Sequence, residues 1–313
     1  MASIDLSRND AIGDEGIACI ASAAKQRAGD GAQAFPSLEE MTLSECSIGP
    51  PGARSLVGLV LSPDGARRPK WIRLALGSNP IGAEGCAALS ELCAVPGRGS
   101  SLSRLRLPGC SAGDGGIGRL SAAATSRPCA GMEALDLSDN SVTKDGAGAF
   151  ADSLVGSWPD LAELRLAKNE LGPGGVAAVM GALVGRDDET AGAPGGTKNS
   201  TLRDVDLTRT NCGAKGAEAA LTRASLSTLR LFNNRLGSDG FRSIAPLLRG
   251  GHPFLKNLDL GGNDAEEDAV VALLNAIADK GDGMSKLAVL EIGGNKFGDD
   301  VMAALEELKR VWP

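Results

Sequence analysis

A short pattern of apolar residues recurs along the whole chain, and it constrains the fold more than any other feature. Each copy has the form L-x-x-L-x-L-x-x-N, with Asn, Cys or Thr at the last position. Self-similarity at intervals of roughly 20 to 50 residues is typical of solenoids, in which each repeat stacks on the next. The sequence therefore predicts a solenoid of about ten repeats, whose last positions are Asn9, Cys46, Asn79, Cys110, Asn140, Asn169, Thr210, Asn234, Asn263 and Asn295.

Two periodicities alternate within each copy. The first half alternates apolar and other residues, as in Leu105-Arg106-Leu107, and this predicts a short strand with its leucines on one face. The second half opens with a pair such as Ile81-Gly82 and continues with apolar residues three and four apart, which predicts a helix. Because one repeat cannot bury its own apolar face, neighbours stack. We expect a right-handed α/β horseshoe, with a parallel sheet on the concave face and helices on the convex face.

The residue that ends each pattern has a predicted structural role. An Asn side chain there is expected to bond backbone groups of adjacent turns that would otherwise be buried without partners. Cys46, Cys110 and Thr210 stand in place of Asn at three of these positions. We interpret the two cysteines as structural and not as redox groups.

In this pattern the chain resembles the ribonuclease-inhibitor type of leucine-rich repeat, and the resemblance covers nearly all of it. The same repeat class occurs in NOD-like receptors and in the Ran GTPase-activating protein. The resemblance implies that Cys is usual at the positions of Cys46 and Cys110. It is specific for the fold and only weakly specific for the function.

Composition and charge exclude several function classes. The formal net charge of −7 argues against a nucleic-acid partner, which needs a basic face. Without an apolar stretch of about 18 residues, membrane insertion is not expected, and the first residues do not resemble a signal peptide. Seven cysteines without CxxC pairs fit a reducing compartment. We expect an intracellular, cytoplasmic protein of eukaryotic type, with cytoskeletal association as a further option.

The spacing of the repeats varies at three places. Polar, Gly-rich insertions near residues 29–36 and 186–200 lengthen two repeats and are expected to be mobile loops within a single domain of residues 1–313. Leu207 and Leu231 are only 24 residues apart (231 − 207), which predicts a shortened helix around Ala217–Leu221.

Signatures of enzyme chemistry are sparse. His252 is the only histidine, which rules out metal sites with several His ligands and leaves little for a His-based triad. The glycines of Gly113-Asp114-Gly115-Gly116 fall where the repeat begins its helix, so they are interpreted as turn residues and not as a phosphate loop. We predict no catalytic residues, no metal site and no cofactor.

The most informative surface is the predicted concave face. The leucines of each strand should point toward the helices, and the residues between them should point into the concave space; we call these the outward positions, because they point away from the core. The position before the last Leu reads, in repeat order, Asp5, Thr42, Ala75, Arg106, Asp136, Arg165, Asp206, Arg230, Asp259 and Glu291. Its alternating signs fit either a self-neutralising ladder of cross-strand ion pairs or a polar floor that recognises a partner.

Two spots on this face are candidate partner-binding sites. The first holds Arg73, Arg104 and Arg106, where an acidic tail or loop could dock or where Glu39, Glu40 and Glu45 could pair internally. The second has Phe232 as the only aromatic side chain at a position that points into the concave face. Its neighbours Gly261, Gly262, Gly293 and Gly294 carry no side chain and would let a partner approach the backbone. The other candidates around Phe232 are Arg230, Asn233, Asn257, Asp259 and Glu291. Arg165, which lies on the concave face between the two spots, is a further candidate.

A non-enzymatic protein-interaction module or scaffold is the favoured function, because an extended concave surface is what this architecture offers. One alternative is a GTPase activator similar to the Ran-specific family, since Ala167–Pro173 is similar in style to its repeats. Another is a structural subunit that self-associates, because the predicted strand around Ile4–Leu6 has no cap over its edge.

Overall fold

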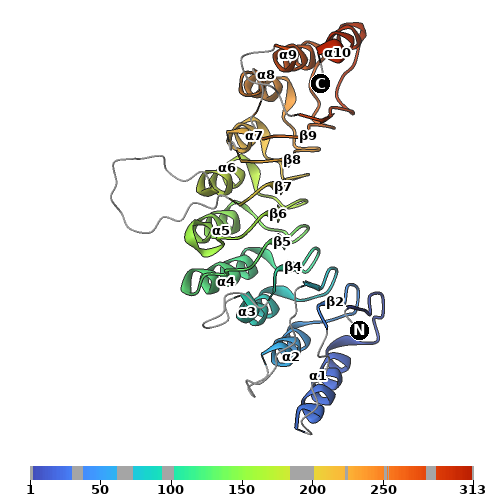
Figure 1. Cartoon of the computed structure of the whole chain (residues 1–313), viewed down its shortest axis with the longest axis vertical. Coiled ribbons are helices and arrows are strands. Elements are labelled where there is room, and N and C mark those ends of the chain that lie inside the picture. Colours follow the sequence, from blue (N-terminus) through green and yellow to red (C-terminus); the bar gives the residue numbers. More distant parts are fainter. Residues whose placement is uncertain are drawn as a thin grey trace, which may run out of the picture.

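The structure is a computed structural model, and it describes residues 3–29, 38–61, 73–93, 102–183, 201–222, 225–249, 252, 254–279 and 287–311. These residues form ten strands that alternate with ten helices along the chain. The strands make one parallel sheet in sequence order, from β1 to β10. The elements form an arc with the strands on the inner side and the helices on the outer side (Figure 1). The predicted leucine-rich-repeat solenoid is confirmed.

Every strand is three residues long: β1 Ser3–Asp5, β2 Glu40–Thr42, β3 Arg73–Ala75, β4 Arg104–Arg106, β5 Ala134–Asp136, β6 Glu163–Arg165, β7 Asp204–Asp206, β8 Thr228–Arg230, β9 Asn257–Asp259 and β10 Val289–Glu291. The helices are α1 Gly13–Gly29, α2 Pro50–Val60, α3 Gly82–Cys93, α4 Gly113–Ser126, α5 Lys144–Ser157, α6 Gly172–Leu183, α7 Gly213–Leu221, α8 Gly237–Leu248, α9 Glu267–Ala278 and α10 Asp299–Val311. Each strand–helix pair is one repeat.

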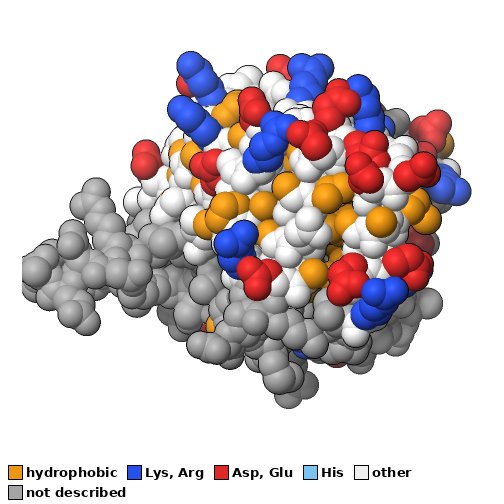
Figure 2. Space-filling view, turned by 90° about the horizontal axis from the view of Figure 1, so that it is seen from above, with side chains coloured by type: hydrophobic (Ala, Val, Ile, Leu, Met, Phe, Trp, Pro, Cys, Tyr) orange, Lys and Arg blue, Asp and Glu red, His pale blue; other side chains and the backbone are white. Residues whose placement is uncertain are grey.

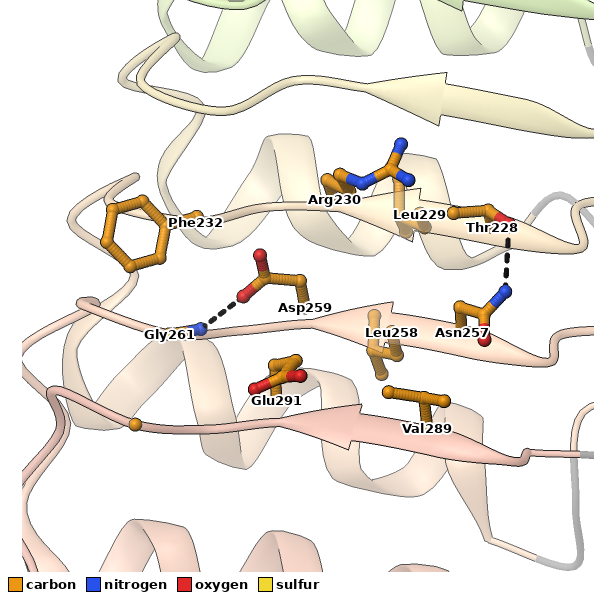
Figure 3. Close-up of a pocket in the computed structure, with 11 residues that line it drawn as sticks. Thr228, Leu229, Arg230, Phe232, Asn257, Leu258, Asp259, Gly261, Val289 and Glu291 are labelled. Carbon is orange, nitrogen blue, oxygen red and sulfur yellow. Dashed lines mark hydrogen bonds between the residues drawn. The ribbon is translucent and has the colours of Figure 1, made fainter.

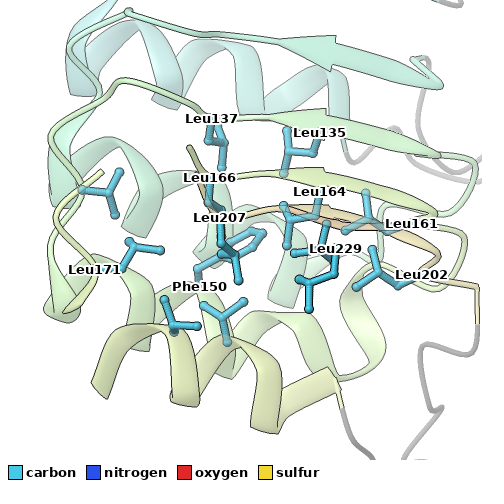
Figure 4. Close-up of a cluster of buried hydrophobic side chains, with 14 of the residues drawn as sticks. Leu135, Leu137, Phe150, Leu161, Leu164, Leu166, Leu171, Leu202, Leu207 and Leu229 are labelled. Carbon is cyan, nitrogen blue, oxygen red and sulfur yellow. The ribbon is translucent and has the colours of Figure 1, made fainter. Parts of the chain in front are cut away.

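The core lies between the sheet and the helices. Leucines of the repeated pattern, such as Leu135, Leu137 and Leu164, point from the strands toward the helices and are almost completely buried (Figure 4). In the first repeat Ile4 and Leu6 are only partly buried, because within the described part of the chain β1 has a neighbouring strand on one side. Burying one large aliphatic side chain stabilises a fold by about 1.5–3 kcal/mol. A single repeat cannot bury its own apolar face, so most of this stabilisation comes from stacking on its neighbours.

The residues that end the patterns connect each repeat to the one before it. Asn140 shows the arrangement: its Nδ2 donates to the carbonyl oxygens of Leu107 and Leu137, and its Oδ1 accepts from the backbone amides of Cys110 and Ala112. Asn79, Asn169, Asn234, Asn263 and Asn295 bond backbone groups in the same way. These side chains satisfy buried backbone groups that no strand partner reaches.

Cysteine and threonine replace only part of this function. The thiols of Cys46 and Cys110 donate to the carbonyl oxygens of Leu6 and Leu76 at 3.1 Å in both cases. The hydroxyl of Thr210 donates to the carbonyl oxygen of Leu207 at 2.8 Å. Asn9, in the first repeat, is exposed and bonds its own turn through Nδ2.

Several helices are capped by an acidic side chain from the preceding repeat. Oδ1 of Asp14 accepts from the amides of Gly49 and Gly52 at the start of α2. Asp114 accepts from the amide and hydroxyl of Thr143 at the start of α5. Because a carboxylate is favourable at the positive end of a helix dipole, these contacts stabilise the stack as well as each helix.

The predicted irregularities have different outcomes. Helix α7 has nine residues and is the shortest of the described helices, as the short spacing predicted. The first insertion was predicted to begin at Gly29, but α1 continues through that residue because its 17 residues extend over the preceding Ala-rich segment. Residues 30–37 and 184–200 lie outside the described residues, so the loop predictions there stay predictions.

The C-terminal end of the stack exposes apolar side chains among charged ones in the view along the long axis (Figure 2). Phe297 and Met302 of the last repeat are 44% and 54% exposed. Among the described residues, no helix is long and apolar enough to span a membrane.

Candidate binding surface

The outward strand positions form rows across the concave face, because every pair of neighbouring strands has the same register. Arg106 is opposite Asp136, Asp136 is opposite Arg165, and the row continues through Asp206 and Arg230. Asp259 and Glu291 follow on β9 and β10. The row read from the sequence is therefore one continuous line of side chains.

Of the two alternatives for this row, the ladder of cross-strand ion pairs does not form among the described residues. Within the described part of the chain, no salt bridge joins Arg106, Arg165 or Arg230 to an aspartate on a neighbouring strand. The aspartates instead accept from the backbone amide two residues later: Asp5 from Ser7, Asp136 from Ser138, Asp206 from Thr208 and Asp259 from Gly261. A short Asp side chain reaches its own turn more easily than a guanidinium on the next strand.

One hollow of about 510 Å³ lies on β8, β9 and β10, and we call it the C-terminal hollow (Figure 3). Its lining combines five predicted site residues with others that the sequence did not single out. The lining residues are Thr228, Leu229, Arg230, Phe232, Asn257, Leu258, Asp259, Gly261, Val289, Glu291 and Gly293.

The C-terminal hollow combines polar and apolar groups. Nδ2 of Asn257 donates to the hydroxyl of Thr228 at 3.2 Å, so both groups are held in place (Figure 3). Arg230 and Glu291 are exposed and make no ion pair with any described residue. Val289 is 44% exposed at the edge of the same hollow.

Phe232 changes the interpretation of the neighbouring glycines. Its ring is 37% exposed and lies over Gly261 and Gly262, so a methyl group at either residue would lie 3.0–3.3 Å from ring carbons. The prediction that these two glycines let a partner approach the backbone is wrong, because the ring of Phe232 already occupies that space. At Gly293 no atom lies within 4 Å of such a methyl group, so that backbone is open.

Asn233, also predicted to contact a partner, is exposed and has a φ of 54°. Residues with φ from 54° to 76° precede the pattern-ending residue at Arg8, Glu45, Ser78, Gly109, Asp139, Lys168, Arg209, Gly262 and Gly294 as well. Asn tolerates this left-handed region better than most side chains do. The turn geometry therefore accounts for Asn233 without a partner.

A second hollow, of about 500 Å³, lies on β2, β3, β4 and β5, and we call it the N-terminal hollow. It brings together all three arginines of the first predicted spot. Its lining residues are Glu40, Thr42, Ser44, Arg73, Leu74, Ala75, Gly77, Arg104, Arg106, Pro108 and Asp136.

The arginines of this region have different partners. Nη1 of Arg73 lies 3.4 Å from Oε2 of Glu40. Arg104 reaches past Ala134 on β5 to Glu163 on β6 at 3.5 Å, and Glu163 also pairs with Arg165 at 2.5 Å. The sequence did not indicate this pairing, because the two residues are 59 positions apart.

Other candidate groups have structural explanations. His252 is buried, and its Nδ1 accepts from the amide of Leu255 at 3.2 Å. Cys46, Cys86, Cys93, Cys110, Cys129 and Cys212 are buried free thiols. Burial raises the pKa of Cys86 to about 11 and the pKa values of Cys110 and Cys212 to about 12, which makes them poor nucleophiles. No group of His, Cys, Asp and Glu side chains suited to a metal ion occurs within the described ranges.

Comparison with known proteins agrees with this architecture. The family described as Leucine Rich repeat matches residues 2–21, 71–90 and 132–151. The ribonuclease inhibitor of Mus musculus is 30% identical over 213 residues, which is 68% of this chain and 43% of that protein. The ribonuclease inhibitor of Sus scrofa is 26% identical over 280 residues, or 87% of this chain and 56% of that protein. The chain thus spans about half the length of these curated relatives.

A solved structure extends the comparison of folds. The leucine-rich-repeat protein LegL7 from Legionella pneumophila superimposes with a TM-score of 0.53 over 99% of this chain and 91% of that one, at 13% identity. The repeats, the sheet and these matches define a leucine-rich-repeat protein, a class that typically binds other proteins. Within that class, the chain has distant similarity to ribonuclease inhibitor.

Proposed function

We propose that this chain is a non-enzymatic protein-interaction module that holds a partner protein in its concave face, with the C-terminal hollow as the main contact. The observation that carries the proposal is the composition of that hollow. An exposed aromatic ring, an exposed Val289 and an Arg230 without an ion pair among the described residues surround the open backbone of Gly293.

This combination has the properties of an interface hot spot. Aromatic and arginine side chains dominate binding energy where a partner can exclude water from them, and polar groups at the margin give specificity. The ring of Phe232 packs against Gly261 and Gly262, which restricts its movement, so less conformational entropy is lost when a partner covers it. Asn257 and Asp259 are also held by hydrogen bonds before any partner binds.

The names of the relatives support the proposal, and two further properties of the chain lead to proposals on its location and its domain organisation. Relatives that carry the name ribonuclease inhibitor are named for action on another protein, and not for a reaction of their own. Seven free cysteines, six of them buried, fit a reducing compartment, so we propose a cytoplasmic location. We also propose that residues 1–313 fold as one domain, because one sheet runs through the described repeats.

The test compares partners captured by the wild type and by the double variant Arg230→Glu/Phe232→Ala, with quantitative mass spectrometry of proteins recovered from a lysate of the source organism. The control is Arg249→Glu/Leu247→Ala, which likewise reverses one arginine charge and truncates one exposed apolar side chain, on α8 and the residue after it, on the convex side of the same repeat. Arg249 also pairs with Asp279, so the control is the more disruptive of the two charge reversals. Circular dichroism and urea unfolding confirm that all three proteins are folded.

We expect the double variant to lose a defined set of proteins, with affinity reduced about tenfold or more, as for a hot-spot residue. The convex control should keep them. Equal recovery by both variants would contradict the C-terminal hollow as the main contact. A small GTPase in the lost set would turn attention to the GTPase-activator alternative.

Self-association is the second candidate, and the exposed edge of β1 favours it. Among the described residues β1 is paired with β2 alone, and such an edge is a template for another strand. Light scattering after size-exclusion chromatography would show a mass that rises with protein concentration. The mass should fall back to the monomer when Asp5 is replaced by Pro, because the amides of Leu6 and Arg8 point toward β2 and that of Asp5 therefore points toward the free edge. A constant monomer mass would exclude this candidate.

A further inference from the structure

We propose that the N-terminal hollow binds an acidic peptide segment of the partner, with a carboxylate held between Arg73, Arg104 and Arg106. This inference rests on the proposed function, because it gives the concave face a second contact of stated chemistry. The C-terminal hollow has one arginine among its lining residues, whereas this hollow has three.

The register creates a square of four outward positions at this place. Arg73 is opposite Arg104, and Ala75 is opposite Arg106. Neighbouring strands lie about 4.8 Å apart, and alternate residues of one strand lie about 6.6 Å apart. Three corners of the square therefore carry arginine, and the fourth carries only the methyl group of Ala75. The missing side chain leaves room for an anion beside three guanidinium groups.

Internal acids pair with two arginines of this square and leave Arg106 without an ion pair among the described residues. Glu40 contacts Arg73 at 3.4 Å, and both side chains are about half exposed, so this pair is weak. Glu163 is already paired with Arg165 at 2.5 Å when it meets Arg104 at 3.5 Å. Oδ1 of Asp136, the residue opposite Arg106, accepts from the amide of Ser138. Arg106 is exposed and makes no ion pair with any described residue.

The surrounding charges favour a peptide carboxylate over a dense polyanion. Glu40, Asp136 and Glu163 lie around the arginines, and the chain carries a formal net charge of −7. A nucleic acid or an anionic membrane would bring an extended array of charges close to these acids and be repelled, whereas a short acidic peptide can place one or two carboxylates beside the arginines. Pro108 and Thr42 line the hollow and offer apolar and hydroxyl contacts to the peptide chain.

The experiment measures fluorescence anisotropy of a short, fluorescein-labelled oligoglutamate peptide titrated with the full chain at low ionic strength. Oligoglutamine and oligolysine peptides of the same length are the neutral and cationic controls. The variants are Arg106→Gln, which removes the unpaired cation, and Ala75→Glu, which places a carboxylate in the empty corner. Arg54→Gln makes the same change of charge at an exposed residue of α2 on the convex side.

We expect the wild type to bind oligoglutamate and neither control peptide. Arg106→Gln should weaken binding about tenfold, since one charge-assisted hydrogen bond to a carboxylate is lost. Ala75→Glu should abolish binding, and Arg54→Gln should leave it unchanged. Arg106→Lys should restore part of the affinity, because it restores the charge without the planar fork of donors.

Equal affinity of the wild type, Arg106→Gln and Ala75→Glu for oligoglutamate would overturn the proposal, as would equal binding of oligoglutamine. A phosphoserine peptide that binds much more tightly, and whose binding is lost in the same variants, would overturn the assignment of a carboxylate and show that the bound group is a phosphate. Failure of this proposal can be told apart from failure of the proposed function. The capture experiment changes residues of β8 and the turn that follows it, whereas the peptide experiment changes residues of β3 and β4.

Discussion

The ring of Phe232 lies over the backbone of Gly261, so that a methyl group at residue 261 would lie 3.0 Å from Cδ2 of the ring. The same methyl group would lie 3.0 Å from the carbonyl oxygen of Gly293 on the next repeat. The absence of a side chain at residue 261 is thus part of how the C-terminal hollow positions its aromatic group.

This contact predicts the effect of Gly261→Ala. The added methyl group overpacks the site, and we expect it to lower the free energy of unfolding by about 1–2 kcal/mol. In a Phe232→Ala background the loss should be smaller, because the ring is gone while the contact with the Gly293 carbonyl remains. Urea unfolding of the four proteins gives this double-mutant cycle. Gly293→Ala is the control and should change stability little; additive effects at residues 232 and 261 would contradict the contact.

The bonds of Asn140 predict a large difference between two equivalent positions of the repeat. Asn140→Ala removes five hydrogen bonds, to Leu107, Leu137, Ser138, Cys110 and Ala112, and leaves buried backbone groups without partners. We expect a loss of about 3 kcal/mol or more, measured by urea unfolding. Asn9→Ala removes two exposed bonds and should cost well under about 1 kcal/mol. Similar losses of unfolding free energy at both positions would show that burial does not determine how much the Asn side chain stabilises the repeat.

The buried thiols predict how stability depends on alkaline pH. The pKa values of Cys110 and Cys212 are raised to about 12 in the folded chain from 9.0, and that of Cys86 is raised to about 11. Because the folded pKa lies above the unfolded one, the stabilisation is fully present below about pH 9. It is lost as pH rises toward 12, by about 1.4 kcal/mol per pH unit for each such thiol. The chain contains no tyrosine, so phenol ionisation does not contribute.

Thiol labelling with a disulfide reagent checks the same burial at pH 8. Only Cys19, the exposed cysteine, should react quickly in the folded chain, and all seven should react in urea. In addition, Cys110→Ala should flatten the loss of stability between pH 9 and pH 12. Rapid reaction of several cysteines in the folded chain would contradict the raised pKa values.

The sequence by itself determined the repeat, the alternation of strand and helix, and the rows of the concave face. The reason is that every repeat pairs with its neighbour in one register, so equivalent positions in the pattern become neighbours in space. For this reason both hollows contain residues that the pattern alone placed together, such as Arg73 with Arg104 and Arg230 with Asp259.

Only the tertiary structure decided which side chains meet within those rows. Glu163 contacts Arg104 across a strand because Ala134 between them is too small to intervene. Asp136 bonds its own turn and not Arg106, and the ring of Phe232 fills the space over Gly261. Such contacts depend on side-chain length, rotamer and the distance between repeats, which a pattern of apolar spacing does not contain.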